Sequence, residues 1–258
     1  MELGLKGKVV LVTGGSKGIG LACAEAFLAE GARVAICSRS KANVDRALAG
    51  LPGALGFAAD CADAAAAADM IGKVESRLGP IDVLVNSAGA ARRTPPPELT
   101  PAAWREAFNA KFFSYINVID PLVKRMAERG RGVVVSIIGA GGKVASVTHL
   151  AGGSANAALM LATAGLGAAY AGKGVRVVGV SPGLTETDRV AEGLAAEARL
   201  SNVRLDDARR RSVDRIPMGR MALPSEIASV VVFLASPKAG YVTGVTLSMD
   251  GGQLPVVI

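Results

Sequence analysis

The sequence of 258 residues has few aromatic side chains, one histidine and three cysteines. No apolar run reaches the ~18 residues that a membrane span requires. The opening stretch MELGLKGKVV lacks the charged, apolar and small-residue regions of a secretory signal. The cysteines are too scattered for a disulfide framework or a metal cluster. We therefore expect a soluble, cytoplasmic protein with reduced thiols, no metal site and no membrane contact.

The charge balance favours an anionic small molecule over nucleic acid as the ligand. The net charge is +7, but the basic residues are spread along the chain apart from Arg92–Arg93 and Arg209–Arg211. No aromatic ladder or known nucleic-acid motif accompanies them. The excess charge therefore indicates either a solvated basic surface or a site for an anionic cofactor or substrate.

Seven short apolar runs alternate with helical segments. Strands that are almost continuously apolar are buried on both faces, which is typical of a parallel sheet between two helical layers. The pattern predicts an α/β fold with a doubly wound, seven-stranded and mainly parallel sheet. The runs are KVVLVTG, ARVAICSR, GALGFAAD, IDVLVNSAG, GVVVSIIGAGG, GVRVVGVSPG and GVTLSMDGG.

No linker, repeat or change in composition divides the chain, so we expect one domain over residues 1–258. Thr100 is a plausible N-cap for a helix that starts near Pro101. The longest irregular region runs from about 184 to 217 and leaves the carboxyl end of the sixth strand. Ligands of open parallel sheets bind at such ends, so this segment is expected to act as a substrate lid. A loop without function is the alternative.

The first strand runs into TGGSKGIG, residues 13–20, and a helix follows at once. Glycines let such a turn approach a pyrophosphate, and the helix N-terminus offers unpaired N–H groups to it. Together with NSAG at 86–89, SPGLTET at 181–187 and the segment from Ile216 to Gly252, this turn resembles the short-chain dehydrogenase/reductase family of the classical type. The resemblance covers the whole chain and implies a Rossmann-type dinucleotide-binding domain.

The resemblance also implies a set of cofactor contacts. The glycine turn would hold the adenosine and pyrophosphate, the end of the third strand would flank the adenine, and the two later motifs would reach the ribose and the nicotinamide. The residues concerned are Gly14, Ser16, Lys17, Gly18, Ile19, Asp60, Cys61, Asn86, Ala88, Gly89, Pro182, Gly183, Leu184, Thr185 and Thr187.

Charge at the end of the second strand favours NADP(H) over NAD(H). Proteins that bind NAD place an acid there for the ribose 2′-hydroxyl. This chain has Ser38 at that position, followed by Arg39, and Lys17 lies in the glycine turn. One hydroxyl donor and two cations suit a 2′-phosphate. Lys17 and Arg39 as solvated surface residues are the alternative.

The usual catalytic set of the family is a serine and a Tyr-x-x-x-Lys pair, in which the lysine lowers the pKa of the tyrosine. No Tyr-x-x-x-Lys occurs in this chain. Alignment of the motifs puts Gly139 at the serine, Gly152 at the tyrosine and Asn156 at the lysine. The chain is therefore expected to be an atypical member without the Ser–Tyr–Lys set.

Three residues are candidates for substituted machinery. His149, the only histidine, lies three residues before Gly152 on the loop that enters the same helix, and it can exchange protons near neutral pH. Asn156 can hydrogen-bond a ribose hydroxyl, and Asn109 is matched to an asparagine that holds a water in the family's proton relay. Ser146, Thr148 and Ser154 are weaker candidates. A loop histidine without a task and a capping or core asparagine are the alternatives.

Three functions follow from this combination. The first is a reductase of carbonyl compounds, or dehydrogenase of hydroxyl compounds, with a non-standard active site, in which water can serve as the acid. The second is a lyase, isomerase or hydrolase on the same scaffold, and the third is a catalytically weak NADPH-binding or partner protein. The intact cofactor motifs favour the first. The small residues of GGSANAALMLATAGLGAAY, 152–170, also favour close helix pairing in a homodimer or homotetramer.

Overall fold

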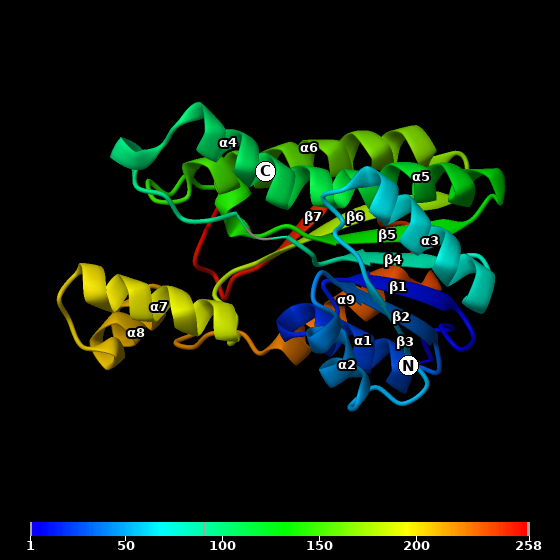
Figure 1. Cartoon of the computed structure of the whole chain (residues 1–258), viewed down its shortest axis with the longest axis horizontal. Coiled ribbons are helices and arrows are strands. Elements are labelled where there is room, and N and C mark those ends of the chain that lie inside the picture. Colours follow the sequence, from blue (N-terminus) through cyan, green and yellow to red (C-terminus); the bar gives the residue numbers. More distant parts are fainter. Residues whose placement is uncertain (1, 90, 257–258) are drawn as a thin grey trace.

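The computed structural model describes residues 2–89 and 91–256 and contains one sheet (Figure 1). All six neighbouring strand pairs are parallel, in the order β3-β2-β1-β4-β5-β6-β7. The sheet is thus parallel throughout rather than mainly parallel, and each of the seven apolar runs forms a strand. The strands are β1 Val9–Thr13, β2 Arg33–Ser38, β3 Leu55–Ala58, β4 Val83–Asn86, β5 Gly132–Ile137, β6 Val175–Pro182 and β7 Thr246–Met249.

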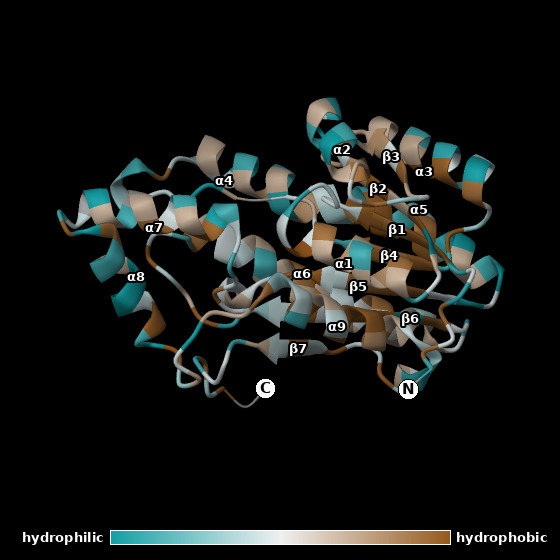
Figure 2. Cartoon of the chain, turned by 90° about the horizontal axis from the view of Figure 1, so that it is seen from below, coloured by the Kyte–Doolittle hydropathy of each residue, from teal (hydrophilic) through white to brown (hydrophobic). Residues whose placement is uncertain are grey.

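Helices cover both faces of the sheet, as expected for a doubly wound fold (Figure 1). One apolar core lies between the sheet and one layer, and a second core lies between the sheet and the other layer. Figure 2 shows the strands as the most hydrophobic part of the chain. The first layer is α1 Gly18–Ala29, α2 Lys41–Leu48 and α9 Pro224–Ala235; the second is α3 Ala64–Leu78, α4 Pro101–Phe108, α5 Ser114–Glu128 and α6 Leu150–Ala171.

The passage from α4 into α5 is an irregular part of the second layer. The Thr100 hydroxyl accepts a hydrogen bond from the backbone N–H of Ala103 at 3.2 Å, and Pro101 opens α4, which confirms the predicted cap. A π-helical turn, η2 (Asn109–Phe113), then joins α4 to α5. Such turns add a residue to the helix and often occur at functional sites. Short 3₁₀ turns are η1 Pro96–Glu98, η3 Ala140–Gly142 and η4 Pro237–Ala239.

Polar side chains line up where the central strands end. Thr13 of β1 is in register with Asn86 of β4, and Asn86 is in register with Ser136 of β5. All three are buried. Because parallel strands present their carboxyl ends at one edge, this row forms the floor beneath the loops that follow β1, β4 and β5.

The segment from 184 to 217 is more regular than a loop. It contains α7 Asp188–Leu200 and α8 Leu205–Val213, which project from one end of the sheet (Figure 1). Leu194, Ile216 and Met221 form a small apolar core of their own there, and the outer face of α8 is hydrophilic (Figure 2). Among the described residues, no helix is long and apolar enough to cross a membrane. The role of this pair as a lid remains a prediction.

Candidate active site

The glycine turn after β1 is closed by contacts that leave no room for side chains. Gly14 and Gly18 have φ values of +65° and +56°, a region that favours glycine. A Cβ on Gly14 would lie 2.8 Å from the backbone of Ala88, and one on Gly18 would lie 3.3 Å from Thr187. The turn therefore brings together residues from the predicted β1, β4 and β6 motifs.

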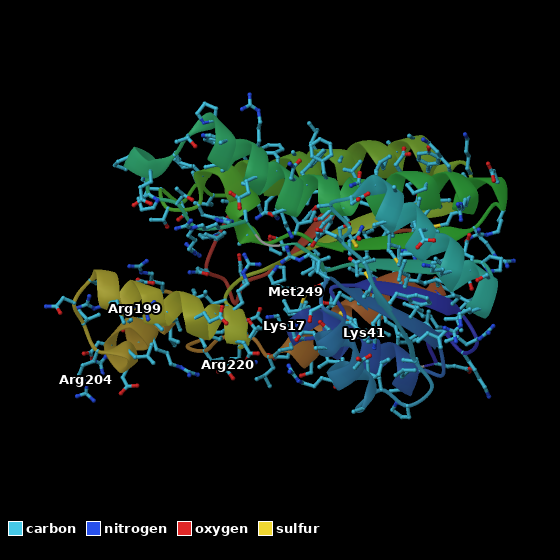
Figure 3. The ribbon with its side chains drawn as sticks, viewed as in Figure 1. Lys17, Lys41, Arg199, Arg204, Arg220 and Met249 are labelled. Carbon is cyan, nitrogen blue, oxygen red and sulfur yellow. The ribbon has the colours of Figure 1, made fainter. Side chains whose placement is uncertain are left out.

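The start of α1 is open to an anion. Lys17 is the N-cap of α1 in an extended conformation, and in the described chain no side chain caps these N–H groups. Lys17 is exposed, whereas Ser16 and Ile19 are half-buried. Figure 3 shows Lys17 at the end of the sheet that faces the α7–α8 pair. This bare, positively flanked helix start fits the pyrophosphate of a dinucleotide.

The end of β2 adjoins the glycine turn. The backbone N–H of Gly15 donates to the carbonyl of Cys37 at 3.2 Å. A Cβ on Gly15 would lie 2.7 Å from Ile36, so this position also requires glycine. Ser38 is half-buried and Arg39 exposed. A hydroxyl and a guanidinium therefore stand beside the turn, where the 2′-position of an adenosine ribose is expected.

The two residues predicted to flank an adenine face different ways. Asp60 is exposed, and its carboxylate accepts a hydrogen bond from the backbone N–H of Ala62 at 3.0 Å. Cys61 is buried, and its Sγ lies 3.7 Å from that of Cys37. The side chain of Asp60 can reach a ligand, whereas that of Cys61 points into the protein. All three cysteines are free thiols.

The loop after β4 is held by the Thr13 hydroxyl. It donates to Oδ1 of Asn86 at 3.1 Å and accepts from the backbone N–H groups of Ser87 and Ala88 at 3.2 Å each. Nδ2 of Asn86 is buried with no partner among the described residues. Gly89 has φ +98°, and a Cβ there would lie 2.6 Å from Oγ of Ser114. The loop thus approaches α5 closely and leaves one amide donor unused.

The loop after β6 is equally tight. A Cβ on Gly183 would lie 2.9 Å from Cα of Asp250, which follows β7. Thr185 is buried and donates to the carbonyl of Gly183 at 3.3 Å, while Thr187 caps α7 by accepting from Val190 N–H at 3.4 Å. Pro182 is the last residue of β6, and Leu184 packs in the small core beneath α7.

An imidazole lies against Gly152, the residue that the sequence motifs align with the family's tyrosine. A Cβ on Gly152 would overlap Cε1 of His149 and would lie 2.7 Å from its Nε2 and 2.8 Å from Cβ of Ala91. The ring of His149 therefore occupies the space that a side chain on residue 152 would need. Its Nδ1 is buried with no partner in the described part of the chain.

Gly139 and Asn156, which the sequence motifs align with the family's serine and lysine, also lie close together. Gly139 has φ +103°, so a serine there would be strained, and a Cβ would lie 3.4 Å from Nδ2 of Asn156. A Cβ on Gly141 would lie 3.1 Å from Cδ2 of His149. Asn156 is buried, and its Oδ1 lacks a partner among the described residues. His149 and Asn156 thus both face the turn that follows β5.

Asn109 does not join this group. It is exposed and lines a shallow surface pocket with Trp104 and Phe113. Two residues later, Lys111 is buried in the π-helical turn. Its Nζ donates to the carbonyl of Ile137 at 3.0 Å and to the Tyr115 hydroxyl at 2.8 Å. The turn therefore directs Lys111 rather than Asn109 toward the end of β5.

Lys111 is not among the site residues that the sequence predicts, although the sequence carries a signal for it. Lys111 lies four residues before Tyr115 and eight before Ile119, both of which face the core on α5. A lysine on an apolar stripe is rare, and Lys almost never becomes fully buried unless it is paired. Both acceptors of Lys111 here are neutral oxygens, from Ile137 and Tyr115.

The electrostatics of this group are dominated by positive charge. Burial, and then the cations Arg93, Arg189 and Lys111, lower the pKa of His149 to about 4, so its imidazole is neutral at pH 7. Burial, and then Arg189, lower the pKa of Lys111 to about 7. Burial raises the pKa of Tyr115, which therefore stays a phenol. At pH 7 the charged and neutral forms of Lys111 are therefore present in similar amounts, whereas His149 and Tyr115 are both in their neutral forms.

Two arginines reach this region from opposite sides. Arg93, after β4, donates to the Thr148 hydroxyl at 3.4 Å, and Arg189 of α7 donates to the carbonyl of Ala91 at 3.5 Å. Within the described chain, neither guanidinium forms an ion pair with a carboxylate. Nor do the described residues gather a His, Cys, Asp and Glu cluster that would hold a metal.

Comparisons with known proteins show the family and the fold of the chain. Residues 14–253 match a family described as enoyl-(acyl carrier protein) reductase. The chain is 37% identical over 254 residues to an acetoacetyl-CoA reductase of Rhizobium meliloti, with 95% of this chain and 98% of that protein covered.

Solved structures are similar over the same length. An actinorhodin polyketide ketoreductase variant with NADPH has a TM-score of 0.92 and 32% identity, with 95% of this chain and 97% of that chain covered. The L-sorbose reductase of Gluconobacter frateurii, in complex with NADPH and L-sorbose, has a TM-score of 0.93 and 28% identity, with both chains covered at 100%. The similarity thus extends across sheet, cofactor motifs and the α7–α8 pair.

Proposed function

Since the chain belongs to the short-chain dehydrogenase/reductase family of oxidoreductases, we propose that it is an NADP(H)-dependent member that reduces a carbonyl group, or oxidises a hydroxyl group, in a non-standard active site. The observation that carries the proposal is the junction of the glycine turn with the end of β2. There Ser38 and Arg39 stand in place of an acid, beside the Gly15–Cys37 hydrogen bond. A hydroxyl and a cation favour a 2′-phosphate over a 2′-hydroxyl.

The chain offers each part of the dinucleotide a matching surface. The uncapped start of α1 and the bare glycine turn suit the pyrophosphate, and the unused amide donor of Asn86 faces the loop after β4. Lys17 adds a second cation near the phosphates. The cofactor, when bound, supplies or accepts the hydride.

In the catalytic half, His149 and Asn156 would act as neutral groups. With its pKa at about 4, His149 is an imidazole at pH 7 and can orient a substrate oxygen by donating a hydrogen bond. Asn156 can bond a hydroxyl or a water through its free Oδ1. Neither group carries an exchangeable charge at neutral pH, so the proton for the product must come from elsewhere.

The substrate that this site suits carries a negative charge near its carbonyl group. Arg93 and Arg189 flank His149 and lack carboxylate partners in the described chain, so an anionic substrate would relieve their mutual repulsion. Scattered surface charge is the alternative explanation.

A fluorescence titration with NADPH and NADH tests the cofactor assignment. We expect NADPH to bind at least tenfold more tightly than NADH and to be oxidised when carbonyl compounds are added. Binding of neither dinucleotide would refute the proposal and favour a non-redox enzyme or a partner protein. Binding without turnover of any carbonyl compound would favour an NADPH sensor, a reading that the missing Ser–Tyr–Lys set keeps open.

The protein would act in the cytoplasm as a homodimer or homotetramer. Its three free thiols suit a reducing compartment. The α6 helix, rich in small residues, carries Leu161 with 76% of its surface exposed, and a second copy would cover it. Light scattering at micromolar concentration tests the assembly, and a single monomeric species would rule it out.

A further inference from the structure

Lys111 is a buried titratable group for which the proposed function has so far given no task. It has 8% of its surface exposed and lies in the π-helical turn between α4 and α5. No carboxylate of the described residues forms an ion pair with it, so its charge is not balanced as a buried structural cation usually is. Such an arrangement is costly to stability, and groups of this kind cluster at functional sites.

The contacts of Lys111 place its ammonium at the end of β5. One N–H donates to the carbonyl of Ile137 and a second to the hydroxyl of Tyr115, which itself donates to Ile137 at 2.5 Å. An ammonium has three donors, and within the described chain the third has no acceptor. The backbone held by Lys111 leads directly into Gly139, where a side chain would meet Asn156.

Unused acceptors lie around the same turn. Oδ1 of Asn156 and Nδ1 of His149 are both buried without partners among the described residues. The positive charge of Lys111 contributes to the lowered pKa of His149, so the two side chains interact electrostatically. The free donor of Lys111 and the free acceptors of Asn156 and His149 thus lie near the turn that follows β5. Buried polar groups without protein partners are commonly satisfied by an ordered water or a substrate oxygen.

We propose that Lys111 is the proton donor for the substrate oxygen, acting through a water held by Asn156, in place of the absent tyrosine. This inference rests on the proposed carbonyl reduction. The carbonyl carbon gains a C–H bond with the electron pair of the C–H bond that the proposed nicotinamide cofactor would give up on its oxidation, and the C=O π pair moves to oxygen. That oxygen forms an O–H bond with a proton from the water, which regains one from Nζ of Lys111. The neutral amine is reprotonated by solvent.

The charged surroundings of Lys111 suit this task. Arg189 of α7 faces it with a positive charge, Tyr115 of α5 presents a phenol, and His149 before α6 presents a neutral imidazole. Burial and Arg189 bring the pKa of Lys111 to about 7, close to the value at which a proton donor works best in neutral solution. In the oxidation direction, the same amine accepts the proton.

The test compares wild type with Lys111→Met and Lys111→Arg, and uses Lys124→Met on the following helix, α5, as the control. Lys124 is exposed and paired with Asp120. For wild type and control, kcat of carbonyl reduction should fall about tenfold per pH unit above about pH 7. Lys111→Met should lower kcat about 100- to 10,000-fold and remove this dependence. The kcat of Lys111→Arg should also be independent of pH, because an arginine does not release its proton.

A second measurement follows the ionisation of Lys111 directly and needs no turnover. In protein labelled with ¹³C at lysine Cε, the signal lost in Lys111→Met should titrate near pH 7, whereas exposed lysines titrate near pH ~10.4. A Lys111 signal that titrates above pH 9, or a kcat profile unchanged in Lys111→Met, would overturn the role of Lys111 alone. No carbonyl turnover by wild type would overturn the proposed function and this role together.

Discussion

The imidazole of His149 lies in the space that a side chain on Gly152 would need, with its Nε2 2.7 Å from the position of a Cβ there. The imidazole of His149 can therefore take this position only because residue 152 is glycine. The histidine and the glycine form one unit, and a change at either position alters the other.

The first prediction concerns this unit. Gly152→Ala should push the imidazole out of its pocket, because the ring is the mobile partner of the clash. Burial is the main cause of the low pKa of His149, so the pKa should rise from about 4 toward ~6.5 as the ring meets water. The chain has one histidine, so its ¹H NMR titration is unambiguous.

Gly165→Ala on the same α6 helix is the matched control, because nothing lies within 4 Å of a Cβ there. It should leave the histidine titration unchanged. Turnover should fall in Gly152→Ala and in His149→Ala, and the double variant should lose no more than His149→Ala alone. Additive losses would show that the two residues act independently.

The second prediction concerns the choice of dinucleotide. Arg39→Ala should weaken NADPH binding about 10- to 100-fold, because a charge-assisted hydrogen bond to the 2′-phosphate contributes ~1.5–3 kcal/mol. NADH binding should change less than about threefold, since NADH has no such phosphate. Arg33→Ala, at the opposite end of β2, is the control. Equal weakening of both dinucleotides by Arg39→Ala would contradict the assignment.

The third prediction concerns the charge of the substrate. Arg189→Gln should raise KM for a 2-oxo acid about tenfold and leave KM for its methyl ester unchanged, because only the acid loses an ionic contact. Arg199 lies at the outer end of α7, and Arg199→Gln serves as the control (Figure 3). If the ester and the acid were affected alike, the role of Arg189 would be steric rather than electrostatic.

The fourth prediction is a pH dependence of folding stability. The pKa of Lys111 is lowered from 10.5 to about 7 in the folded protein. Between these values the unfolded chain binds the additional proton, so the free energy of unfolding should rise with pH, by up to about 1.4 kcal/mol per unit. Below pH 7 the destabilisation is fully present.

Urea unfolding of wild type and Lys111→Met at intervals from pH 6 to 10 measures this effect. The variant lacks the titrating group, so the difference between the two free energies isolates it. That difference should move in favour of wild type as the pH rises from 7 to 10. A constant difference would mean that Lys111 keeps an ordinary pKa in the folded state.

Much of the fold was predictable because each of its signals is local. The runs around Val9–Thr13 and Val83–Asn86 are apolar throughout, which is what burial on both faces of a parallel sheet demands. The cap at Thr100 follows from the chemistry of one hydroxyl and a following proline. Such features depend on neighbours in sequence and need no knowledge of distant contacts.

The catalytic half was less predictable because it depends on registers and rotamers. A motif alignment finds that Gly152 lacks a side chain, but only packing shows that His149 fills the gap. Asn109 was chosen for its residue type, whereas the π-helical turn exposes it and buries Lys111 instead. No sequence signal used here distinguishes an α-helical turn from a π-helical one at this point.

The π-helical turn has a consequence for how this chain tolerates insertions and deletions. The wider winding of the π-helical turn takes up one surplus residue, so α4 and α5 follow one another without a break. Removing any one residue of 109–113 would restore α-helical winding there, and Lys111 would lose the turn that directs it toward the end of β5. The number of residues in this five-residue stretch is therefore constrained as strictly as the identity of any side chain in it. This holds even at positions where a single substitution would be tolerated.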